Sequence, residues 1–171
     1  AGDFDGDGKC DLVLYNTESA TWRIIDSSTC VQREVPWGNP GNQPTPADYD
    51  GDGKTDIAVY EDSEGAWHIL KSSTGEECQY AWGWPGGDPA PGDYDGDGRA
   101  DLAVYDDQTG AWYIRSITTG AMIVLQLGAP GMQAVQGDYD GDGRMDPAVY
   151  DPKTGLWYML YSSTGTVGFA Y

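Results

Sequence analysis

The sequence contains few basic residues. Of its 171 residues only 9 are Lys or Arg, against 28 Asp or Glu, and the formal net charge is −19. Proteins that bind nucleic acid or anionic membranes use clustered Lys and Arg to neutralise phosphate groups, so we expect no nucleic-acid partner. No apolar run approaches the ~20 residues that cross a bilayer, so we expect no membrane insertion.

Cysteine is scarce as well. The chain has 3 cysteines, Cys10, Cys30 and Cys78, and none of them recurs in the repeats described below. An odd number allows one disulfide and one free thiol in an oxidising compartment. The sequence does not select which pair would form.

One pattern occurs four times along the chain. The acidic segment DFDGDGK at residues 3–9 returns at 45-residue intervals, beginning at Asp48, Asp93 and Asp138. A fixed period of this length, with several strands in each copy, is typical of a β-propeller. We divide the single domain 1–171 into repeats 1–47, 48–92, 93–137 and 138–171.

Each repeat is expected to form four short strands and no helix. An apolar run follows every acidic segment, at residues 12–15, 57–60, 102–105 and 148–150. These runs are apolar on both faces, as in strands that are buried on both sides. Next comes an alternating strand, in which Trp67 and Ile69 oppose His68. A variable strand such as 121–127 and the segment before each acidic loop, such as 90–94, complete the set.

The predicted fold is therefore an all-β propeller of four four-stranded blades. Gly/Pro-rich linkers at 37–41, 82–86 and 127–131 lie only between repeats. Four blades could thus close without a further covalent link, and we favour this closed ring. The alternative is half of a larger ring, such as a dimeric eight-bladed one. Pro147 holds the first position of the last apolar run, where proline is tolerated, so we expect only a local effect.

Each acidic segment reads D-x-D-G-D-G-[KR]-x-D, and we number its positions 1 to 9. Calcium takes six to eight oxygen ligands, mainly carboxylates and carbonyls, and needs a glycine where the chain turns sharply. Positions 1, 3, 5 and 9 offer carboxylates and position 7 a carbonyl. The predicted ligands of four Ca²⁺ sites are Asp3, Asp5, Asp7, Lys9 and Asp11; Asp48, Asp50, Asp52, Lys54 and Asp56; Asp93, Asp95, Asp97, Arg99 and Asp101; and Asp138, Asp140, Asp142, Arg144 and Asp146.

Turns that lack metal also use Asp-Gly pairs. Four carboxylates close together nevertheless repel one another strongly unless a cation joins them. Four calcium ions would reduce the net charge from −19 to −11, and we expect the calcium to be structural. The segment is no EF-hand, because position 12 holds Leu or Val rather than the bidentate Glu. Magnesium is disfavoured because it seldom uses an all-protein cage.

The segment 92–99 (GDYDGDGR), followed by 101–105 (DLAVY), resembles the FG-GAP/VCBS family of calcium-binding β-propeller repeats. The same repeats form the head of integrin α subunits. This resemblance covers essentially the whole chain. It implies a protein that is secreted or on the cell surface and that acts in adhesion or ligand binding. Most members form rings of seven or more blades, and many are appended to extracellular enzymes.

We expect no catalytic activity. The only histidine, His68, occupies a repeat position that other copies fill with Arg or Tyr. Carboxylate pairs of the kind that glycosidases use are concentrated in the acidic segments, where calcium accounts for them. The repeated Ser-Ser-Thr segments are expected to be turns whose hydroxyls bond to the backbone.

The seven tryptophans form two sets. Four share one strand position and are expected in the core: Trp22, Trp67, Trp112 and Trp157. Trp37, Trp82 and Trp84 lie in the linkers, where they could stack on a ligand or cap the propeller edge.

The expected function is a non-catalytic extracellular calcium-binding module that recognises a protein or glycan. The alternatives are a carbohydrate-binding lectin, a structural protein that self-assembles through its outer strands, and the accessory domain of a secreted enzyme. A homo-oligomer is compatible with each of these functions.

Overall fold

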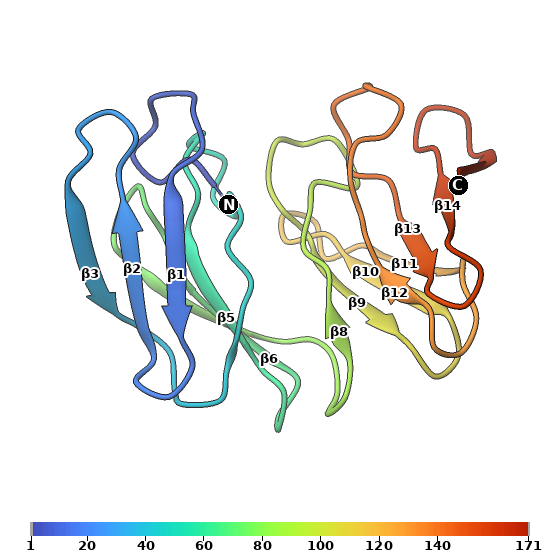
Figure 1. The fold of residues 1–171 in the computed structure, drawn as a ribbon, viewed down its shortest axis with the longest axis horizontal. Coiled ribbons are helices and arrows are strands. Elements are labelled where there is room, and N and C mark those ends of the chain that lie inside the picture. The colour runs from blue at the N-terminus through green and yellow to red at the C-terminus, as the bar shows by residue number, and fades with distance from the viewer. Residues whose placement is uncertain (1, 171) are drawn as a thin grey trace. The chain divides into compact units, whose positions relative to one another are not determined.

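Strands and loops make up the whole of the computed structural model, which describes residues 2–170. The chain forms two compact units, Ala1–Pro85 and Gly86–Tyr171. Each unit contains two antiparallel sheets, which we call blades 1 and 2 and blades 3 and 4 in chain order (Figure 1).

The first unit contains strands β1 to β7. Blade 1 has the order β1-β2-β3, and blade 2 has the order β4-β5-β6-β7. The bounds are β1 (Leu12–Asn16), β2 (Thr21–Ile25), β3 (Gln32–Pro36), β4 (Gln43–Pro44), β5 (Ile57–Glu61), β6 (Ala66–Leu70) and β7 (Glu77–Ala81).

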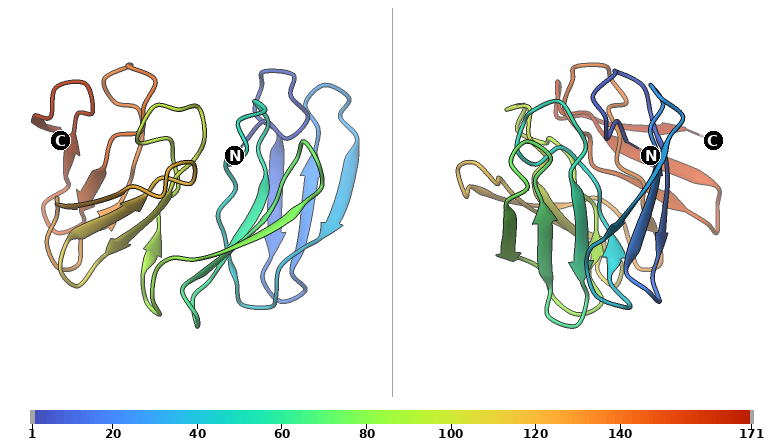
Figure 2. Two further views of the ribbon diagram at one scale, coloured as in Figure 1. Left: turned by 180° about the vertical axis from the view of Figure 1, so that it is seen from behind. Right: turned by 90° about the vertical axis from the view of Figure 1, so that its left-hand side faces the viewer.

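The second unit contains strands β8 to β15, in two blades of four strands each, and its ribbon can be followed in Figure 2. Blade 3 has the order β8-β9-β10-β11, and blade 4 has the order β12-β13-β14-β15. The bounds are β8 (Asp88–Pro89), β9 (Leu102–Asp106), β10 (Ala111–Arg115), β11 (Met122–Gln126), β12 (Gln133–Ala134), β13 (Ala148–Asp151), β14 (Leu156–Leu160) and β15 (Val167–Ala170).

The predicted fold class is confirmed: the protein is all-β and has four blades of a β-propeller. Four strands were predicted for every repeat, and blades 2, 3 and 4 have four, whereas blade 1 has three among the described residues. The position of the first strand of blade 3 was also predicted wrongly. The segment 90–94 is not the short edge strand of blade 3, which lies at Asp88–Pro89, and only an isolated bridge joins Gly92 to Asp101. Pro147 has the expected local effect, since β13 begins one residue later than the equivalent strands.

A pair of aromatic rings recurs at the centre of each blade. Tyr and Trp lie opposite each other on neighbouring strands, with ring centroids 4.8 Å apart for Tyr15–Trp22 and 5.3 Å apart for Tyr60–Trp67. The later blades keep the pair at 5.1 and 5.2 Å. Trp22, Trp67 and Trp112 are fully buried, as expected of core residues, whereas the fourth tryptophan of the set, Trp157, is only partly buried.

The apolar run after the acidic loop is buried in blades 2, 3 and 4. Ile57 and Val59 of β5 pack against Phe4, Trp22 and Ile24 of blade 1. In β1, however, Leu12 and Leu14 are each 72% exposed. The prediction that this run is buried on both faces is therefore wrong for β1, because burial of that face requires a preceding blade.

Among the described residues, no helix is long and apolar enough to cross a membrane.

Candidate metal centres

Each acidic segment folds into a tight loop around its first aspartate. In blade 2, the two oxygens of Asp48 accept hydrogen bonds from the amides of Gly51 and Gly53, at 2.6 and 2.8 Å. These glycines have φ values of +76° and +85°, which a residue with a side chain rarely adopts. The other three loops repeat these bonds and these positive φ angles.

The aspartate at position 9 is buried under the loop. Asp56 is 0% exposed; one of its oxygens accepts the amide of Tyr49 and the other accepts the amide of Ser72. Burial raises the pKa of Asp56 above its usual value, although these hydrogen bonds oppose the shift. For Asp101 in blade 3, burial raises the pKa to about 6, and the neighbouring charges of Asp95 and Asp97 add to this shift. A cation beside these carboxylates would favour their ionised form.

Positions 1, 3 and 9 meet in every loop. In each trio, every residue offers one oxygen, and these oxygens lie within 4.8 Å of one another. The trios are Asp3, Asp5 and Asp11; Asp48, Asp50 and Asp56; Asp93, Asp95 and Asp101; and Asp138, Asp140 and Asp146. The structure thus brings together twelve of the predicted carboxylate ligands.

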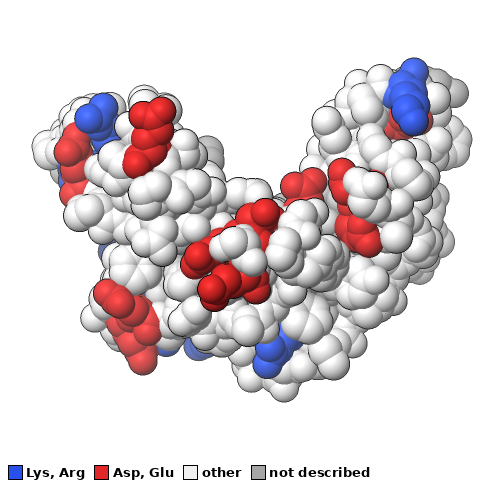
Figure 3. All heavy atoms as spheres, turned by 90° about the horizontal axis from the view of Figure 1, so that it is seen from below, with Lys and Arg blue, Asp and Glu red and all other residues white. Residues whose placement is uncertain are grey.

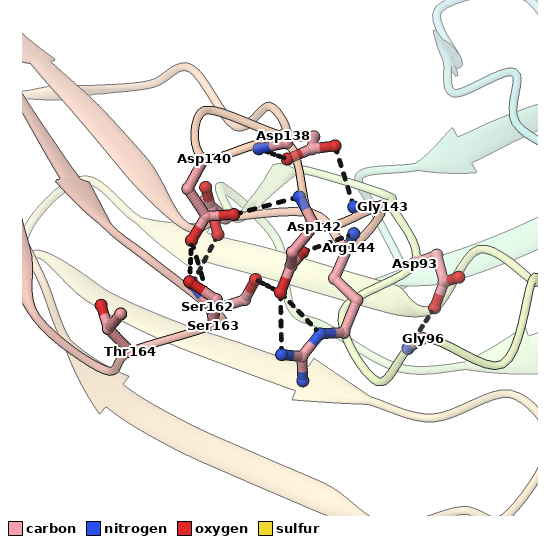
Figure 4. A network of polar contacts seen from close by, with 12 residues as sticks. Asp93, Gly96, Asp138, Asp140, Asp142, Gly143, Arg144, Ser162, Ser163 and Thr164 are labelled. Carbon is pink, nitrogen blue, oxygen red and sulfur yellow. Dashed lines mark hydrogen bonds and ion pairs between the residues drawn. The ribbon is translucent and has the colours of Figure 1, made fainter.

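The position-5 aspartates lie outside these trios. One oxygen of each accepts the amide at position 7, as in Asp52 with Lys54 at 2.8 Å. In Asp7, Asp52 and Asp142 the other oxygen contacts a neighbouring group, which for Asp142 is the guanidinium of Arg144 (Figure 4). Metal ligation by the side chain at position 5 and by the carbonyl at position 7 remains a prediction.

A serine turn from the same blade touches three of the loops. In blade 2, the Ser73 hydroxyl donates to Asp50 Oδ2 at 2.5 Å, and the Ser72 hydroxyl donates to Asp52 Oδ2 at 3.0 Å. Figure 4 shows the same two contacts in blade 4, made by Ser163 and Ser162.

These contacts to side-chain carboxylates were not predicted from the sequence. We expected the hydroxyls of the Ser-Ser-Thr turns to bond to the backbone instead. The available signal was the constant spacing of 23 residues between Ser28 and Asp5, between Ser73 and Asp50, and between Ser163 and Asp140. In blade 1, the Ser28 hydrogen bond is the main cause that lowers the pKa of Asp5.

Neighbouring loops are joined within each unit. The amide of Thr55 donates to the carbonyl of Asp3 at 2.6 Å, and in the second unit Met145 donates to Asp93 at 2.7 Å. The aliphatic stem of Lys54 covers Gly6 so closely that a Cβ on this glycine would lie 2.7 Å from Lys54 Cε. The two loops of each unit therefore contact and stabilise each other.

A cleft between blades 1 and 2 gathers side chains of opposite charge. It has a volume of about 360 Å³, and its lining includes Arg33, Lys54 and Lys71 as well as Asp5 and Asp26. Arg33 pairs with Asp26 at 3.1 Å, and Lys71 pairs with Glu76 at 2.8 Å. On the face shown in Figure 3, acidic side chains outnumber basic ones.

The linker tryptophans are partly buried. Trp37 packs against the core of the first unit and lines a shallow cleft with Asn39 and His68. The carbonyl of Trp82 accepts the indole N–H of Trp67 at 2.7 Å, and the Trp84 carbonyl accepts the Tyr60 hydroxyl at 2.9 Å. These contacts anchor the linker to the blade.

The histidine and the three cysteines lie outside the metal loops' trios of aspartates. His68 lies 3.1 Å from a carboxylate oxygen of Glu61 on the neighbouring strand. Cys10, Cys30 and Cys78 are free thiols.

Comparison with solved structures shows a shared fold. A catalytically inactive virginiamycin B lyase from Staphylococcus aureus, with quinupristin, has a TM-score of 0.61 and 13% sequence identity to this chain. The similarity covers 95% of this chain and 52% of the lyase chain, so this chain spans about half the length of the lyase chain. No curated protein matches the sequence.

The comparison with protein families agrees with the loop geometry. The FG-GAP-like repeat pattern matches residues 3–59 and 93–149, which together make up more than half of the chain. These segments contain the loops of blades 1 to 4 with their trios of aspartates. The chain belongs to the FG-GAP-like repeat family.

Proposed function

We propose that the protein is a non-catalytic, extracellular propeller module that binds four structural calcium ions and serves in adhesion or ligand recognition. The observation that carries this proposal is the trio of carboxylates in every blade. Membership of the FG-GAP-like repeat family supports the same interpretation.

The residues fit calcium. Three carboxylates supply hard oxygen ligands, which are the type that calcium prefers. The glycines at positions 4 and 6 let the chain turn around the trio without a side-chain clash. A buried aspartate such as Asp101, with its raised pKa, is costly to ionise without a compensating charge. A divalent cation supplies that charge.

The proposed role of calcium is to stabilise the contacts between blades. Asp3 belongs to the first trio, and its carbonyl accepts the amide of Thr55 in the next loop. Fixing Asp3 thereby fixes the point at which blade 2 meets blade 1. A ligand that binds the folded state alone raises stability according to its concentration relative to Kd.

Thermal unfolding with and without calcium tests this proposal. We expect the melting temperature in 1 mM calcium to exceed that in excess chelator by roughly 6–12 °C, which corresponds to a gain of ~3 kcal/mol in a domain of this size. Native mass spectrometry should count four ions per chain, and magnesium at equal concentration is the control. Equal melting temperatures in calcium and chelator would refute the structural role.

Glycan recognition is a second candidate, favoured by the cleft beside Trp37. Its lining combines an indole with Asn39 and His68, and sugars bind to such combinations by stacking and hydrogen bonding. A glycan array probed with the calcium-loaded protein tests it, with Trp37→Ala compared against the unaltered chain. Binding that Trp37→Ala abolishes would support a lectin. If the folded protein bound no glycan on the array, a protein partner would be favoured.

A further inference from the structure

The serine turn makes the same contact in three of the four blades. The second serine of the turn donates its hydroxyl to Oδ2 of the position-3 aspartate at 2.5 Å. The pairs are Ser28–Asp5, Ser73–Asp50 and Ser163–Asp140. Figure 4 shows the pair in blade 4. The contact links the turn after the second strand to the metal loop.

This contact fixes a carboxylate that would otherwise rotate. In blade 2, Oδ1 of Asp50 accepts the amide of Asp52 at 3.3 Å, while Oδ2 accepts the Ser73 hydroxyl. With both oxygens bonded, the side chain is held in one orientation before any cation arrives. Hydrogen bonds to ionised carboxylates are strong, and a preorganised ligand loses less conformational entropy on binding.

Blade 3 lacks the contact. Ile117 and Thr118 hold the positions of the two serines, and no hydrogen bond joins their side chains to Asp95 or Asp97 among the described residues. The backbone contact is also longer there. Ile117 N lies 3.3 Å from Asp101 Oδ1, whereas the equivalent distances in the other blades are 2.6 to 2.7 Å.

We propose that Ser28, Ser73 and Ser163 are positioning residues for calcium, and that the four sites are consequently unequal, with the loop of blade 3 the weakest. The inference rests on the proposed calcium function. Loss of one charge-assisted hydrogen bond should weaken a site by about tenfold.

Hydrogen exchange of the full chain during a calcium titration resolves the four loops, because their peptides differ in sequence. We expect loop 93–101 to gain protection at about tenfold higher free calcium than loop 48–56. Ser73→Ala should move the midpoint of loop 48–56 upward by about tenfold and leave the two loops of the second unit unchanged. Ser63→Ala is the matched control, since the Ser63 hydroxyl bonds to Glu61 in a turn of the same blade.

A variant that introduces the contact into blade 3 tests the inference in the opposite direction. Ile117→Ser combined with Thr118→Ser should lower the midpoint of loop 93–101 toward that of loop 48–56. Equal midpoints in all four loops of the unaltered chain would overturn the inference. So would a Ser73→Ala variant that melts at a lower temperature in chelator while its calcium midpoint is unchanged, because that result assigns the serine to the fold alone. If no loop gained protection at any calcium concentration, the calcium function itself would be refuted.

Discussion

Strands β1 and β5 hold the same place in the repeat and have opposite surroundings. Leu12 and Leu14 of β1 are each 72% exposed, whereas Ile57 and Val59 of β5 are 6% and 0% exposed. All four side chains are large and aliphatic, so hydrophobicity does not explain the difference. The covering face of blade 1, with Trp22 and Ile24, lies against β5. Burial in this fold therefore depends on the adjacent blade rather than on the residue's place in its own repeat.

The largest expected effect concerns the tryptophan on the covering face. Trp22 is 1% exposed against blade 2, while Trp157, at the same position of blade 4, is only partly buried. We expect Trp22→Ala to lower the free energy of unfolding by about 3–5 kcal/mol, since it leaves a large cavity. Trp157→Ala should cost clearly less. Denaturant unfolding in calcium measures both, and equal losses would contradict the dependence on a neighbouring blade.

The next largest effect concerns the face of β5 that blade 1 covers. Ile57→Ala should lower the free energy of unfolding by about 2–4 kcal/mol, because the side chain fills the interface with blade 1. Leu12→Ala is the matched variant on the exposed strand and should change stability by less than about 0.5 kcal/mol.

If Leu12→Ala lowered the free energy of unfolding as much as Ile57→Ala, the claim that Leu12 is exposed in solution would be contradicted. That result would show that β1 is covered by another blade of the same chain or by a second copy. Light scattering would then separate the two cases, because only a second copy doubles the mass.

The smallest expected effect is a dependence on pH. The pKa of Asp101 is raised to about 6 by burial, against an ordinary value of 3.8 for the unfolded chain. The folded state then holds its proton more tightly between these values, so its stability falls as pH rises through that window. In chelator, the melting temperature should be higher at pH 5 than at pH 7, and Asp101→Asn should reduce the difference. Calcium should remove or reverse it, since the cation favours the ionised carboxylates.

Much of the fold could be predicted from the period of the sequence. The 45-residue spacing fixed four equivalent units, and the alternation of Trp67, His68 and Ile69 gave the direction of each side chain in β6. Trp67 and Ile69 are buried and His68 is partly exposed, as predicted. The short edge strand at Asp88–Pro89 could not be located, because two residues carry no periodic pattern.

The metal loops were predictable for a different reason. Their ligands lie within nine consecutive residues, so local geometry alone brings positions 1, 3 and 9 together. The serines that orient position 3 are 23 residues away, and only the pairing of strands returns them to the loop. The weaker backbone contact of Ile117 in blade 3 was likewise visible only in the folded chain.

The sequence by itself determined the repeat, the strand class and the acidic loops, because each depends on contacts between residues that are close along the chain. The tertiary structure alone decided that Leu12 is exposed while Ile57 is buried, and that the Ser73 hydroxyl donates to the carboxylate of Asp50 rather than to the backbone. These outcomes depend on which distant segments become neighbours. The residues involved have the same local sequence context whether or not a neighbour is present, so the local pattern does not encode the difference.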